Sequence, residues 1–133
     1  MPFFHVTLFL AFSYSAFGQS DEVNTIYFKT NSFTIDKKYL PTINDIGQKC
    51  ATDTFFFLKI FAYADKKGSK KYNEHLSQKR AYAVYNYLTQ KFSIDTTKIY
   101  VTWLGEETDG AYDLHFPAAR VQQRCVDILL FFK

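Results

Sequence analysis

Cysteine is scarce in this sequence: only Cys50 and Cys125 occur among its 133 residues. A framework of several disulfides is therefore excluded, and a single intramolecular bridge is the one internal pairing that remains. Such a bridge needs Cα atoms within about 7 Å, and nothing in the sequence brings these two together, so a bridge and two buried thiols stay open alternatives. His75 and His115 stand alone, without the spacing of metal ligands. We expect no metal and no cofactor.

Charge of one sign is also limited. The net charge at pH 7 is only +3, and the lysines form several short clusters in place of one continuous basic stripe. This pattern argues against nucleic acid as a partner. Hydrophobic residues make up 47% of the sequence, which is enough for one domain with a sizeable core. No repeat and no low-complexity linker divides the chain.

Residues 1–18 contain no Lys, Arg, Asp or Glu. They are apolar and end with the small residues Ala16 and Gly18, a pattern typical of a secretory signal peptide cleaved before Gln19. The domain would then span residues 19–133. A retained N-terminal anchor is the alternative, although the segment is at the lower length limit for a bilayer span. No cysteine stands immediately after the predicted cleavage point, so we expect an exported mature chain with neither a lipid anchor nor a membrane span.

Hydrophobic periodicity predicts four strands and two main helices. The strands are expected at residues 25–30, 54–64, 99–104 and 125–132, and the helices at residues 36–50 and from about Ser69 to Lys91. The strand at 54–64 is apolar on both faces, so we expect it in the centre of the sheet. Residues 105–117 are expected to form a polar loop and residues 118–123 a short helix. This order predicts an α+β fold, a mixed four-stranded sheet with two main helices packed on it.

One cation falls on an apolar helix face. At about 100° per residue, Leu76 and Leu88 share a face of the second helix, and Arg80 lies between them. A guanidinium cannot lose its charge, so it requires a nearby anion or contact with water. Asp65 ends the preceding strand and Asn73 shares the helical face of Arg80, so we expect all three at one rim of the sheet. We expect Asp65 and Arg80 to be open to water there and replaceable with folding mostly intact. From the residues alone, an ion pair between Asp65 and Arg80 that only stabilises the turn is the simpler interpretation.

The stretch from Asp65 to Leu88 resembles the signature of the OmpA-like (OmpA/MotB) peptidoglycan-binding domain. That signature has an Asp after a strand, Gly and Ser three and four residues on, and then Asn-x-x-Leu-Ser-x-x-Arg-Ala; the matching run here is DKKGSKKYNEHLSQKRA. The C-terminal segment ARVQQRCVDI is similar to the second signature of the family, in which an Arg begins the last strand. The segments WLGEE from Trp103 and IYFKTNSFTI from Ile26 resemble two further family motifs. The likeness covers about residues 25–133, in the right order.

The resemblance implies non-covalent binding of peptidoglycan through the diaminopimelate of its stem peptide. By that resemblance Asp65 takes the ammonium group of the ligand and Arg80 its carboxylate, with Asn73 and Arg124 completing the pocket. A zwitterion suits this pair of side chains, because each bond is charge-assisted and the Arg bond can be bidentate. The implied location is the periplasm or the outer membrane, with other envelope proteins as further candidate partners.

Three places depart from the family pattern. Residues 62–64 read Ala-Tyr-Ala where the family usually has Gly-His-Thr, Lys29 and Asn31 replace common acidic residues, and Cys125 replaces a second Arg. A copy of the fold that has lost its ligand and serves as a protein-interaction or scaffold domain is therefore the alternative function. A hydrolase is disfavoured, because it needs paired carboxylates at a cleft whereas Asp65 is matched to an Arg. We expect no enzyme.

Overall fold

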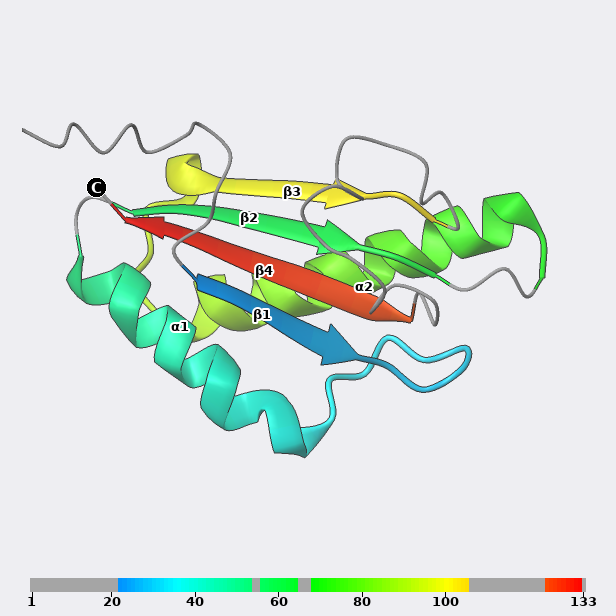
Figure 1. The fold of residues 1–133 in the computed structure, drawn as a ribbon, viewed down its shortest axis with the longest axis horizontal. Helices are drawn as coiled ribbons and strands as arrows, with labels where there is room; N and C mark the ends of the chain where they lie inside the picture. Colours follow the sequence, from blue (N-terminus) through cyan, green and yellow to red (C-terminus); the bar gives the residue numbers. More distant parts are fainter. Residues whose placement is uncertain (1–21, 54–55, 65–67, 106–123, 133) are drawn as a thin grey trace, which may run out of the picture.

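The computed structural model describes residues 22–53, 56–64, 68–105 and 124–132 of the chain. Within these residues, four strands form one mixed sheet in the spatial order β1-β4-β2-β3 (Figure 1). They are β1 (Glu22–Tyr27), β2 (Phe56–Ala62), β3 (Ile99–Trp103) and β4 (Cys125–Phe132). Strand β4 pairs antiparallel with β1 and β2, while β2 and β3 run parallel. The predicted mixed sheet is confirmed, and the strand expected in its centre is one of the two inner strands.

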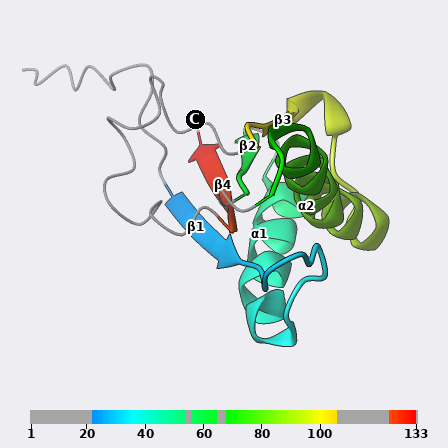
Figure 2. The same cartoon turned by 90° about the vertical axis from the view of Figure 1, so that its right-hand side faces the viewer.

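In the described part of the chain, two α-helices lie on one side of the sheet (Figure 2). A 3-10 turn, η1 (Lys37–Tyr39), leads into α1 (Leu40–Thr52), while α2 (Lys70–Lys91) packs on β2 and β3 and is followed by the 3-10 turn η2 (Thr96–Lys98). Helix α2 begins where the sequence predicts it. Ser69 is its N-cap, and the Ser69 hydroxyl oxygen accepts a hydrogen bond from the backbone N–H of Tyr72 at 3.1 Å.

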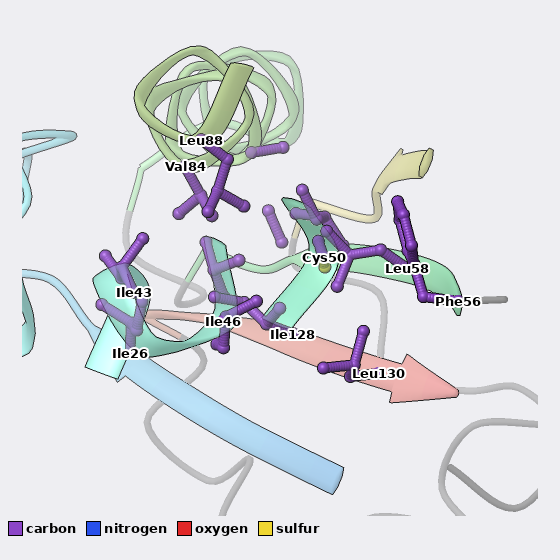
Figure 3. Close-up of a cluster of buried hydrophobic side chains, with 14 of the residues drawn as sticks. Ile26, Ile43, Ile46, Cys50, Phe56, Leu58, Val84, Leu88, Ile128 and Leu130 are labelled. Atoms are coloured by element: carbon purple, nitrogen blue, oxygen red, sulfur yellow. The ribbon is translucent and has the colours of Figure 1, made fainter. Parts of the chain in front are cut away.

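The main core lies between the helices and the sheet (Figure 3). Successive side chains of a strand point to opposite faces, so every second residue of β2 and β4 faces the helices. The core side chains labelled in Figure 3 are Ile26, Ile43, Ile46, Cys50, Phe56, Leu58, Val84, Leu88, Ile128 and Leu130. Each of them is at most 5% exposed, so both helices and three of the strands contribute to one apolar layer.

The opposite face of the sheet carries a second, smaller apolar cluster. Phe61, Tyr63, Cys125 and Leu129 are buried in it. Cys50 belongs to the main core and Cys125 to this second cluster, so the sheet separates the two thiols, and they are not joined by a disulfide. Of the two alternatives for the cysteines, the structure therefore has two buried thiols. Burial, with smaller contributions from the charges of Asp53 and Glu22, raises the pKa of Cys50 to about 11.

The first strand is shifted from its predicted position by three residues at both ends. It was expected at residues 25–30 but is found at Glu22–Tyr27. The chain leaves the sheet because it turns tightly just after Lys29, whose carbonyl oxygen accepts a hydrogen bond from the backbone N–H of Ser32 at 3.0 Å. Asn31 in this turn has a left-handed backbone with φ of 57°, which Asn tolerates better than most residues. β-propensity alone did not reveal this turn.

Three predictions fall on parts of the chain beyond the description. The signal peptide at 1–18 and the short helix at 118–123 lie outside the described residues, as does the loop at 105–117 apart from Gly105. Among the helices of the described ranges, none combines the length and the apolar character needed to cross a bilayer.

Candidate functional site

One end of the sheet gathers the segments in which the sequence places the site. The carboxyl ends of β1, β2 and β3 meet there with the start of β4, because β4 is antiparallel to both of its neighbours (at the right in Figure 1). Backbone pairing continues past the strands at this end. The N–H of Tyr63 donates to the carbonyl of Cys125 at 2.8 Å, and the N–H of Phe28 donates to the carbonyl of Arg124 at 2.7 Å. Chain segments far apart in sequence are thus held side by side.

Gly105 is the point at which β2, β3 and α2 meet. Its carbonyl accepts the N–H of Ala64 at 2.7 Å, and its own N–H donates to the hydroxyl oxygen of Ser77 on α2 at 2.9 Å. The backbone of Gly105 is left-handed, with φ of 59°, and a Cβ there would lie 3.2 Å from the backbone of Glu74. Glycine therefore allows the end of β3 to approach the first half of α2 closely.

Ser77 and Gly105 are site-supporting residues that sequence reasoning did not single out. Ser77 is fully buried, accepts the N–H of Gly105, and donates its own hydroxyl to the carbonyl of Glu74 at 2.8 Å. The available signal was the Leu-Ser pair of the helix motif together with the Gly of WLGEE. These two short motifs are contact partners, which their separate positions in the chain do not reveal.

Arg80 is fully buried, with an exposed fraction of 0%, and backbone carbonyls hold its guanidinium. Nε donates to the carbonyl of Ser32 at 2.8 Å, Nη1 to that of Tyr63 at 3.1 Å and Nη2 to that of Lys29 at 3.1 Å. Its Cζ atom also lies 5.3 Å from the centre of the Phe28 ring, a cation–π contact. Arg80 thus ties the loop that follows β1 to the end of β2.

The expectation that Arg80 lies at a solvent-open rim is wrong. Helix α2 turns the face that carries Leu76, Arg80 and Val84 toward the sheet, and all three side chains are buried. The cation tolerates this position because carbonyl oxygens of the turn after β1 and of the segment after β2 replace water as hydrogen-bond acceptors. Asn73, seven residues earlier on the same side of α2, is also buried, at 1% exposure.

Arg124 lies at the same end of the sheet, immediately before β4. Its Nη1 donates to the hydroxyl oxygen of Thr30 at 3.2 Å, so it contacts the same loop that Arg80 holds. The structure therefore brings Asn73, Arg80 and Arg124 together around one end of the sheet. Asp65, the acidic member of the predicted site, lies outside the described residues, and its role stays a prediction.

Two grooves are lined in part by the loop at residues 29–33, in the part of the molecule that the structure describes. One, of about 520 Å³, is lined by residues that include Phe28, Lys29 and Arg124. We call the other, of about 550 Å³, the Lys79 groove. Its lining includes Asn31, Phe33, Lys71, Tyr72, His75 and Lys79. No cluster of three or more His, Cys, Asp or Glu side chains with the placement of metal ligands occurs among the described residues.

These features define a small α+β domain in which one helix sets an arginine against the strand ends of a mixed sheet. The chain belongs to the OmpA family, whose model matches residues 27–124. The chain is 35% identical over 83 residues to outer membrane protein 41 of Porphyromonas gingivalis, an alignment that covers 62% of this chain and 21% of that protein. It is 38% identical over 68 residues to the peptidoglycan-associated lipoprotein of Buchnera aphidicola, covering 51% of this chain and 39% of that protein. The alignments therefore span less than half the length of both relatives.

Solved structures share the fold. The crystal structure of the peptidoglycan-associated lipoprotein from Burkholderia pseudomallei superimposes with a TM-score of 0.66 at 24% identity, covering 80% of this chain and 88% of that one. The C-terminal domain of Helicobacter pylori MotB superimposes with a TM-score of 0.63 at 17% identity, covering 83% of this chain and 85% of that one. The predicted OmpA-like fold is confirmed by these similarities.

Proposed function

We propose that this chain binds peptidoglycan non-covalently in the cell envelope, through the diaminopimelate of the stem peptide. Asp65 takes the ammonium group, Arg80 takes the carboxylate, and Asn73 and Arg124 complete the pocket. Membership of the OmpA family supports the class of ligand, and one relative is named for its association with peptidoglycan. The names of both relatives also support a location at the outer membrane or in the periplasm.

The observation that carries the proposal is the contact between Arg80 and the end of β2. Nη1 of Arg80 donates to the carbonyl of Tyr63, and Asp65 follows Tyr63 by only two residues, a chain length of at most about 7 Å. In the proposed site, Asp65 therefore lies in the same region as Arg80. That pairing complements a zwitterion, which presents an ammonium group and a carboxylate close together.

The carbonyl contacts of Arg80 explain how a buried cation could serve a ligand. Three of the five N–H groups of a guanidinium donate to backbone carbonyls, so a ligand carboxylate has to replace some of these acceptors in order to bind Arg80. Two of the three carbonyls, those of Lys29 and Ser32, come from one loop. Lys29, Thr30 and Asn31 in this loop are exposed. A ligand carboxylate would reach Arg80 when this loop moves aside and would replace its carbonyls.

Co-sedimentation with purified cell wall tests the proposal. The mature domain should sediment with the wall, and Asp65→Asn, which removes the charge at constant size, should abolish this binding. Asp95→Asn is the matched control, since Asp95 is an exposed residue that caps η2, remote from the site. Free diaminopimelate should compete, whereas lysine, which lacks the second carboxylate, should compete poorly. Equal competition by both amino acids would contradict the role of Arg80.

A scaffold domain without ligand is the second candidate function. The observation that favours it is the full burial of Arg80 against carbonyl partners, because an arginine with a purely structural role would be held in the same way. Under this alternative, a wild-type domain that is folded by circular dichroism would fail to sediment with cell wall. The same experiment thus decides between the two functions. Release of soluble fragments from the wall would instead indicate an enzyme.

A further inference from the structure

The Lys79 groove lies directly beside the proposed diaminopimelate site. Asn31 lines it, and the residues on either side in the same loop, Lys29 and Ser32, supply two of the carbonyls that hold Arg80. Along α2, the lining residue Lys79 precedes Arg80 in the sequence. The exposed loop therefore contributes both to the surroundings of Arg80 and to the lining of the groove.

The chemistry of this groove is cationic and aromatic. Lys71 and Lys79 supply positive charge, and none of the described residues that line the groove is Asp or Glu. Phe33 and Tyr72 are large aromatic side chains that are 46% and 44% exposed. The ammonium group of Lys79 lies 5.1 Å from the centre of the Phe33 ring, which places charge and an apolar surface next to each other.

The groove also has a defined wall. The hydroxyl of Tyr72 donates to Oδ1 of Asn31 at 3.0 Å, which links the start of α2 to the loop after β1. The backbone of Asn31 is left-handed, with φ of 57°, a conformation that is uncommon for residues other than glycine. A hollow of about 550 Å³ is within the size range of sites for small ligands, and it exceeds what one carboxylate would need.

We propose that the Lys79 groove binds a second carboxylate of the same stem peptide, namely the α-carboxylate of the glutamate that adjoins the diaminopimelate. The inference rests on the proposed function and deepens it, because it makes recognition extend over two residues of the peptide. Lys71 and Lys79 attract the carboxylate by charge-assisted hydrogen bonds, while Phe33 and Tyr72 cover the apolar part of the peptide. The groove thereby distinguishes a free carboxylate from its amide.

Calorimetric titration with three synthetic ligands tests this inference. They are free diaminopimelate, the tripeptide L-Ala-γ-D-Glu-diaminopimelate, and the same tripeptide with the glutamate α-carboxylate amidated. The wild-type domain should bind the tripeptide about tenfold more tightly than its amide, the size of one charge-assisted hydrogen bond. The double variant Lys71→Gln/Lys79→Gln should lose this preference and keep its affinity for free diaminopimelate. Lys91→Gln, an exposed lysine at the far end of α2, is the matched control and should behave as wild type.

The outcomes separate this inference from the proposed function. If wild type binds free diaminopimelate but does not distinguish the tripeptide from its amide, the groove has no role and only the inference is overturned. The same conclusion follows if the double variant keeps the full preference. If wild type binds none of the three ligands, the proposed function itself is overturned. Loss of free diaminopimelate binding in a folded double variant would also contradict a separate groove, because both lysines would then act on the first site.

Discussion

The hydroxyl oxygen of Ser77 accepts the backbone N–H of Gly105 at 2.9 Å, and this bond joins helix α2 to the end of β3. Both groups are buried. The Ser77 hydroxyl therefore takes the place of water as the acceptor for this buried backbone donor, and the bond holds α2 against the strand ends at which the proposed site lies.

Replacing Ser77 by alanine should destabilise the domain by about 1 to 3 kcal/mol, the cost of leaving a buried backbone donor without its partner. Urea denaturation followed by circular dichroism measures this loss. Ser93→Ala, at an exposed serine that follows α2, is the control and should change the free energy of unfolding by less than about 0.5 kcal/mol. Equal, small effects at both positions would show that the Ser77 bond contributes little.

Removing Arg80 should cost more stability than the sequence led us to expect. Arg80→Ala leaves three carbonyl acceptors without their donor in a region where the side chain was fully buried, so we expect a loss of about 3 kcal/mol or more. Arg124→Ala, which breaks a bond to the hydroxyl of exposed Thr30, should cost about 1 kcal/mol or less. The comparison is made by urea denaturation. An Arg80→Ala domain as stable as wild type would contradict the observed carbonyl contacts.

Because Arg80→Ala is expected to destabilise the fold, binding assays on that variant must be read beside its unfolding curve. Arg80→Lys keeps the charge while losing the planar, multiply donating head group. We expect it to remain folded at 25 °C and to bind cell wall at least tenfold more weakly than wild type. Wild-type affinity in Arg80→Lys would show that a point charge suffices at this position.

Gly47 of α1 should resist substitution even though alanine is the better helix former. A Cβ at this position would meet the ring of Phe92, so Gly47→Ala should destabilise the domain by about 1 to 3 kcal/mol through overpacking. In a Phe92→Ala background the ring is gone, and the same change should become neutral or stabilising by up to about 1 kcal/mol, the helix-propensity gain. A double-mutant cycle measures this reversal. Additive effects in the cycle would exclude the contact.

The free energy of unfolding should fall at alkaline pH because of Cys50. The unfolded thiol releases its proton near the ordinary pKa of 9.0, whereas the folded thiol keeps it until a pKa of about 11 because it is buried. Between these pH values the unfolded state therefore binds fewer protons than the folded state. The stabilisation that the protonated, buried thiol gives the folded state is complete below pH 9 and is lost as the pH rises to 11, by about 2 to 3 kcal/mol. Cys50→Ala should be less stable at pH 7 but should show a correspondingly shallower decline. Parallel curves for the two proteins would refute the assignment.

Local signals were sufficient for most elements of the fold. The alternation of apolar residues placed β4 at Cys125–Phe132 as predicted, and the Ser69 cap marked the start of α2, because strand alternation and helix capping depend on neighbours within a few residues. The β1 strand was misplaced by three residues, since the turn that ends it depends on the backbone at Asn31. The family motifs were likewise recognisable from short runs of residues.

The surroundings of each functional side chain could be decided only by the tertiary structure. The sequence by itself determined that Arg80 lies on the apolar face of a helix, because helical periodicity is local. It could not determine that carbonyls of Lys29 and Ser32, about fifty residues earlier in the chain, would bury that cation. Nor could it place Lys79 beside Phe33 or the two cysteines on opposite faces of the sheet. Such contacts arise when strands and helices pack, and packing joins residues irrespective of their distance along the chain.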